Sequence, residues 1–87
     1  MMERMAAKQT MEACAELNRI VETLEMEGEQ LHWNFGNEPP DESVFIIVMT
    51  VGVMEVRRAL SARSIALALP GVIENVIRRD LRGRQWR

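Results

Sequence analysis

The chain has 87 residues, of which 47% are hydrophobic and 28% are charged. These values are ordinary for a folded protein, and the length allows one domain. Its single Cys excludes an intrachain disulfide, and one Cys with one His excludes the usual zinc sites. We therefore expect no metal site and no cofactor.

The net charge of −2 is distributed unevenly along the chain. Residues 1–42 contain ten acidic and three basic residues, a net charge of −7, whereas residues 43–87 contain eight Arg and three acidic residues, a net charge of +5. Such asymmetry is typical of chains that contact nucleic acid or another charged partner. It also arises when the two halves pack against each other, and the sequence leaves both interpretations open.

No segment of the sequence has the features of a signal peptide or of a membrane span. The first residues include acids and lack a continuous apolar block. The longest apolar run, Val44–Met54, is 11 residues long and too short to cross a bilayer as a helix. We expect a cytoplasmic protein that has no membrane partner.

The first predicted element is a long helix over residues 2–33. Good helix formers dominate this stretch and Pro is absent. Apolar residues recur at the 3-4 spacing of a packed helix, among them Leu17, Val21 and Leu24. Gly28 lies on the same stripe and could end the helix, kink it or admit a close neighbour. Residues 34–41 are predicted to form a loop because they contain Pro39-Pro40.

The second predicted element covers residues 42–69 and is harder to assign. Val44–Val53 is rich in β-branched residues and would also suit a buried strand. We favour a helix because the 3-4 spacing continues through this stretch and a solitary strand would lack a partner. Pro70-Gly71 ends the element, residues 72–82 read as a short amphipathic helix, and residues 83–87 form a basic tail.

These elements predict an all-α fold with two long antiparallel helices and a short C-terminal helix, paired into a four-helix homodimer. A helix of about 30 residues spans roughly 45 Å, which exceeds the diameter of a compact chain of this size. A second copy would cover the excess apolar surface. The predicted dimer core consists of Leu17, Val21, Leu24, Ile46, Met49, Val53, Val56 and Leu60.

No catalytic group of residues is evident in the sequence. His32 is the only His and stands beside Trp33, where a packing role is more common than a catalytic one. Cys14 lies on the apolar stripe of the first helix and lacks an obvious activating base. We predict that the protein is not an enzyme and has no small-molecule substrate.

Residues 61–82 contain a recognisable pattern. A hydroxyl residue opens a helix at Ser61, Ala66 lies inside it, a Gly71-Val72 turn follows, and a second helix ends in the signature at 77–81, Ile-Arg-Arg-Asp-Leu. This segment resembles the helix-turn-helix of bacterial repressors of the DeoR type. The resemblance implies that the second helix enters the major groove of DNA. The residues that it places against DNA are Glu74, Asn75, Arg78 and Arg79.

Two functional hypotheses follow. The first is a small helical regulator that binds another protein, such as an antiactivator that occupies a bacterial transcription factor. Met-rich surfaces adapt to partner helices, and Met2, Met5 and Met11 are the candidate contacts. The alternative is a DNA-binding helix-turn-helix transcriptional repressor.

Overall fold

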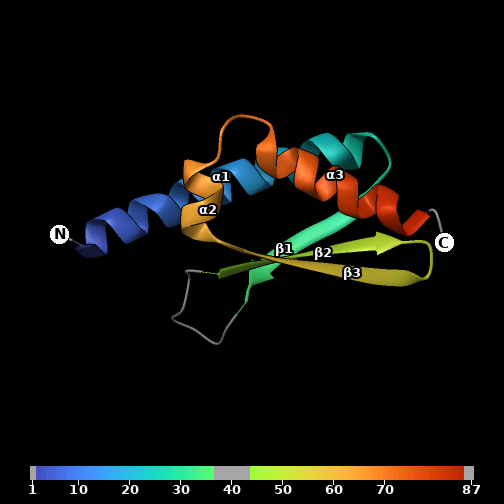
Figure 1. Ribbon diagram of the computed structural model, residues 1–87, viewed down its shortest axis with the longest axis horizontal. Helices are drawn as coiled ribbons and strands as arrows, with labels where there is room; N and C mark the ends of the chain where they lie inside the picture. Colours follow the sequence, from blue (N-terminus) through green and yellow to red (C-terminus); the bar gives the residue numbers. More distant parts are fainter. Residues whose placement is uncertain (1, 37–43, 86–87) are drawn as a thin grey trace.

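The protein is an α/β globule with an N-terminal helix, a three-stranded sheet and two C-terminal helices, as the computed structural model in Figure 1 shows. The structure describes residues 2–36 and 44–85, and side chains over 8–36 and 44–83. The predicted all-α, four-helix fold is therefore wrong. The elements are α1 (Met2–Met26), β1 (Gln30–Phe35), β2 (Val44–Val51), β3 (Met54–Ser61), α2 (Ala62–Leu67) and α3 (Val72–Gln85).

The sheet is antiparallel, with strand order β1-β2-β3. The three helices lie on one face of it, and among the described elements none covers the opposite face (Figure 1). We call these the inner and the outer face of the sheet. The globule measures 46 × 28 × 18 Å, and the long axis in Figure 1 follows α1. One chain thus accommodates a helix that the sequence analysis assigned to a dimer.

Gly28 ends α1, which is one of the three outcomes that the sequence left open. The Gly28 N–H donates to the Glu25 carbonyl and the Glu29 N–H donates to the Leu24 carbonyl, each at 3.0 Å. These two bonds form a Schellman motif, and the φ of +95° at Gly28 suits a residue without a Cβ. The predicted helix over 2–33 is therefore too long, and residues 30–33 belong to β1.

The predicted helix over 42–69 is instead a β-hairpin followed by the short helix α2. Gly52 and Val53 connect β2 to β3, with a φ of +63° at Gly52 and a negative φ at Val53, as in a type II′ hairpin turn. β1 and β3 supply the pairing partners that a solitary strand would lack. Strand pairing therefore overrode the 3-4 spacing, and the β-branched content was the better guide.

The core forms between the inner face of the sheet and one stripe of α1. Phe45, Ile47 and Met49 are fully buried on β2 and belong to the same cluster as Leu17 and Ile20 of α1. Each has a cross-strand neighbour on both sides: Phe35 and Leu60 flank Phe45, Trp33 and Arg58 flank Ile47, and Leu31 and Val56 flank Met49. The rings of Trp33, Phe35 and Phe45 contact one another, with centroids 5.1–5.6 Å apart.

The residues predicted to form a dimer core have different positions in this fold. Leu17, Leu24 and Met49 are buried within the single chain, and Val21, Val56 and Leu60 are partly buried against the same core. Ile46 alternates with the buried residues of β2 and so lies on the outer face of the sheet. Val53 is fully exposed at the hairpin turn. The eight residues thus do not share one surface.

The C-terminal helices begin with recognisable local signals. The Ser61 side chain caps α2 by accepting a hydrogen bond from the Ser64 N–H at 3.0 Å. α2 ends at Leu67, and Gly71, with a φ of +87°, allows the chain to turn before α3. The helix predicted over 72–82 corresponds to α3, which extends to Gln85.

We expect opposite responses to substitution at two apolar residues of the hairpin. Phe45→Ala should lower the free energy of unfolding by about 3–5 kcal/mol, because it empties the centre of the core. Val53→Asp should change it by less than about 0.5 kcal/mol, because its side chain is already in water. Urea denaturation followed by circular dichroism measures both values. A large loss of stability in Val53→Asp would contradict the hairpin.

Candidate protein-docking surface

A groove of about 660 Å³ lies between α1 and the connection from α2 to α3. Glu12, Glu16 and Arg19 line it from α1, and Glu74 lines it from the first turn of α3. The opposite wall is formed by α2 and the connection that follows it, and its side chains are apolar and mostly small. That wall consists of Ile65, Ala66, Ala68, Pro70 and Gly71.

The groove has an excess of negative charge, and we refer to it as the acidic groove. It contains three carboxylates and one guanidinium, that of Arg19. Arg19 Nε lies 2.6 Å from a Glu16 carboxylate oxygen and its Nη1 lies 3.3 Å from a Glu74 oxygen. These carboxylates raise the pKa of Arg19, first through the hydrogen bond that Arg19 donates to Glu16. Two cations outside the lining contact the same carboxylates: Lys8 Nζ lies 4.0 Å from Glu12, and Arg78 Nε lies 3.0 Å from Glu74. Because Glu12 and Lys8 are both largely exposed, Glu12 is the carboxylate most open to a cationic ligand.

Exposed apolar side chains lie next to the acidic groove. Leu67, at the end of α2, is 62% exposed, Leu69 is 75% exposed and Val72, at the start of α3, is 44% exposed. All three belong to the same short stretch of chain as the apolar wall of the groove. We call Leu67, Leu69 and Val72 the apolar rim, and the rim and the acidic groove together the docking surface.

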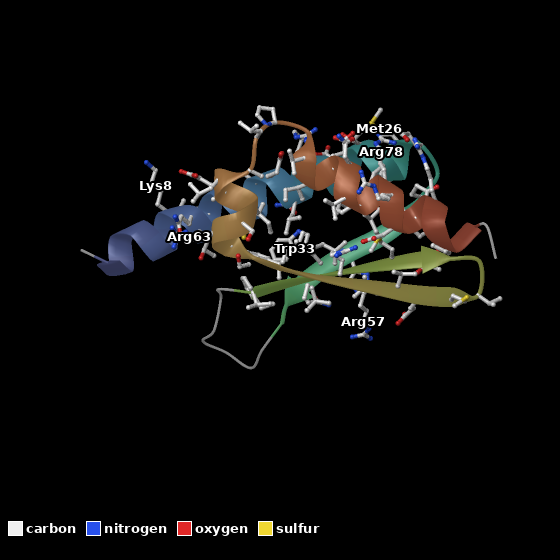
Figure 2. The ribbon with its side chains drawn as sticks, in the orientation of Figure 1. Lys8, Met26, Trp33, Arg57, Arg63 and Arg78 are labelled. Atoms are coloured by element: carbon white, nitrogen blue, oxygen red, sulfur yellow. The ribbon has the colours of Figure 1, made fainter. Side chains whose placement is uncertain are left out.

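Ion pairs fix α3 in position along its border with α1. Both terminal nitrogens of Arg78 donate to the Glu27 carboxylate at 2.7 Å, and its Nε donates to Glu74 at 3.0 Å. Figure 2 shows Arg78 on α3 near the end of α1, where Met26 is labelled. The hydrogen bonds that Arg78 donates to Glu27 and Glu74 raise the pKa of Arg78, and the bonds from Arg78 lower the pKa of Glu27.

A second ion pair fixes the other side of α3. Arg58 of β3 points toward the inner face of the sheet and meets Asp80 through two bonds of 2.6 and 2.7 Å. This bidentate geometry is the strong form of an Arg–carboxylate pair. It raises the pKa of Arg58. Because Ile73, Ile77 and Leu81 are buried between these two borders, α3 is held along three sides.

The four residues that the helix-turn-helix resemblance places against DNA do not form one exposed face. Glu74 and Arg78 are tied into the ion pairs beside α1, whereas Asn75 and Arg79 are exposed to solvent. The segment contains two consecutive helices, α2 and α3, and the resemblance itself stays a prediction. The side chains of its second helix are nevertheless largely occupied by packing against the chain itself.

The Met residues predicted to contact a partner are not part of the docking surface as described. Met11 is 72% exposed on α1, and the side chains of Met2 and Met5 lie outside the described residues. The apolar rim was not predicted from the sequence. Its signal was the pair of leucines beside the Pro70-Gly71 break, because apolar residues in a predicted connection lack a regular element to bury them.

The two residues considered as catalytic candidates lie apart in the structure. His32 is exposed on the outer face of β1, whereas Cys14 is half-buried on α1. Among the described residues, no group of three His, Cys, Asp or Glu side chains gathers where it could hold a metal ion. Within the same part of the chain, none of the helices combines the length and apolar character that crossing a membrane requires.

The chain was compared with known proteins at three levels. Neither protein-family models nor curated proteins nor solved structures give a match.

The ion pairs around Arg78 generate a prediction with a definite pH dependence. Because Arg78 lowers the pKa of Glu27, the pair stabilises the folded state fully above the ordinary glutamate pKa of about 4.5. That stabilisation is lost as the pH falls through the lower pKa of the folded state. Arg78→Met should therefore reduce the free energy of unfolding at pH 7 and reduce it less at pH 3.

Urea denaturation at the two pH values measures this difference. Arg79→Met is the matched control, because Arg79 is the next residue along α3 and its side chain is exposed. We expect the control to be nearly neutral at both pH values. An equal loss of stability in Arg78→Met at pH 7 and pH 3 would show that its effect is one of packing and not of charge.

Proposed function

We propose that this chain is a small, cytoplasmic, non-enzymatic regulator that acts by binding another protein at the docking surface. The observation that carries the proposal is the apolar rim beside the acidic groove. Clustered apolar side chains in water are typical of surfaces that a partner covers. Burying one leucine contributes about 1.5–3 kcal/mol, so Leu67 and Leu69 alone supply a useful part of a binding energy.

The chemistry of the surface specifies the chemistry of its partner. The rim requires apolar side chains, and the exposed carboxylate of Glu12, whose Lys8 partner lies 4.0 Å away, favours a Lys or Arg of the partner. An amphipathic helix with an apolar stripe and basic flanks supplies both. We therefore propose a basic amphipathic helix as the bound segment.

Transcription factors contain segments of this kind. A DNA-contacting helix is basic where it meets phosphates and apolar where it packs on its own domain. A regulator with an acidic groove would compete with DNA for such a helix. This supports the antiactivator that the sequence analysis suggested, with a bacterial transcription factor as the partner we favour.

The alternative, direct binding of DNA through α3, has less support. Arg78 is held by two carboxylates, so a phosphate would have to displace Glu27 and Glu74 from it. The acidic groove also borders α3 at Glu74 and would repel a phosphate backbone there.

A titration with a synthetic helix of Leu and Lys tests the proposal. Wild-type protein should bind this peptide with an affinity that falls as salt is added, because the groove contributes through charge. Leu69→Ser should weaken binding about tenfold or more, because it removes the most exposed residue of the rim. Isothermal calorimetry measures the affinities.

Val53→Ser is the matched control, since Val53 is fully exposed at the hairpin turn, which lies away from the α2–α3 connection (Figure 1). It should bind the peptide as wild type does. Equal binding of a Leu and Glu peptide, or unchanged binding by Leu69→Ser, would overturn the proposal. Binding of duplex DNA in place of the peptide would favour the repressor alternative.

A further inference from the structure

We propose that the outer edge of β1 pairs with β1 of a second copy of this chain, so that two sheets join into one of six antiparallel strands. β1 pairs with β2 on one side, and among the described residues no strand lies on its other side. This inference does not rest on the proposed function, because the edge of β1 contributes no residue to the docking surface.

Along this edge, backbone N–H and C=O groups of β1 point away from β2, where a further strand could pair with them. The Gly36 N–H donates to the Val44 carbonyl at 2.8 Å, which fixes the phase of the β1–β2 ladder. Because hydrogen-bonding directions alternate along an antiparallel strand, Leu31, Trp33 and Phe35 direct their N–H and C=O groups away from β2. A strand placed there would extend the ladder by the same rule.

The side chains of β1 do nothing to protect this edge. Its sequence, QLHWNF, contains no Pro, Lys, Arg, Asp or Glu. Proteins usually guard exposed edges with such residues because an unguarded edge recruits another strand. The opposite edge of this sheet has that protection: β3 includes Glu55, Arg57 and Arg58, and Arg57 points away from the helices in Figure 2.

A flank of α1 that is uncharged over residues 11–21 lies above this edge, and the exposed Glu25 follows on the same side. The Trp33 Nε1 donates to Asn18 Oδ1 at 3.0 Å, which places the Asn18 side of α1 over β1. Met11, Cys14, Asn18 and Val21 follow one another at 3-4-3 spacing and so share this side. Met11 is 72% exposed, and Cys14 and Val21 are only partly buried.

These two neighbouring features favour a second copy over a charged partner. The strand is uncharged and the helix flank beside it is uncharged over residues 11–21, so they meet their own copies with little like-charge repulsion. The far side of α1, by contrast, contains Glu12, Glu16 and Arg19. Antiparallel pairing of identical strands has the two-fold symmetry of an isologous dimer. The interface differs from the predicted four-helix dimer and leaves both docking surfaces accessible.

Light scattering coupled to size-exclusion chromatography tests the dimer. Wild-type protein should have twice the 10.0 kDa mass of one chain. His32→Lys with Asn34→Lys should shift it to the single-chain mass, because both residues are exposed on β1 and the added charges would repel across the two-fold axis. Circular dichroism should show that this variant keeps its fold.

The control is Ala59→Lys on β3. In the register of the sheet, Asn34 and Ala59 are the two cross-strand neighbours of Ile46, and His32 and Arg57 are those of Val48. With Arg57 already present, Ala59→Lys therefore gives the β3 edge cations at the positions that correspond to the two β1 substitutions. It should remain a dimer. A wild-type monomer, a dimer that survives the β1 substitutions, or dissociation by Ala59→Lys would each overturn the proposal.

Amide hydrogen exchange of the wild-type protein gives a second readout that does not depend on any variant. The amides of Leu31, Trp33 and Phe35 should exchange more slowly as the protein concentration rises, because they point along the proposed interface. Exchange that is independent of concentration at these three positions in a dimeric sample would place the interface elsewhere. Loss of peptide binding, by contrast, would affect the docking surface and leave the dimer intact.

Discussion

Burial of the inner face of the sheet is the constraint on which the rest of this structure depends. β2 is the central strand, and Phe45, Ile47 and Met49 need apolar cover on the helix side. The apolar face of a sheet has to be buried against another element, so α1 and α3 lie across it. The lengths and positions of the helices follow from that requirement.

Covering the sheet from one side has consequences at its margins. α1 lies over β1, where the Trp33–Asn18 bond joins them, and α3 contacts β3 through Arg58 and Asp80. α2 and the connection after it close the remaining end, where Leu67 and Leu69 have no inner face left to cover. The apolar rim therefore stays exposed because the inner face of the sheet is already covered, and it is available for binding.

Parts of this fold could be read from the sequence because their signals are local. Gly28 and the Pro70-Gly71 break mark real ends of elements, and the amphipathic pattern over 72–82 corresponds to α3. The hairpin could not be read in the same way. β2 is buried on its inner face, and Val48 on its outer face is only 4% exposed, so its sequence lacks the alternation of a strand with one solvated side.

The site was harder still to predict, because it is assembled from distant parts of the chain. Glu16 and Glu74 meet at Arg19 only because α1 and α3 lie side by side, and no spacing in the sequence records that contact. The helix-turn-helix resemblance, which stays a prediction, covers the segment that contains α2 and α3. It could not show that Arg78 would be occupied by Glu27, a residue far from it in the chain.

The two-sided restraint of α3 has a mechanical consequence. A helix gripped by salt bridges along both borders and by isoleucines beneath cannot roll about its own axis without breaking all of them at once. The wall of the acidic groove that Glu74 forms is therefore already held in place before a partner binds. A wall that is already ordered loses little conformational entropy when a partner binds, so more of the contact energy contributes to affinity.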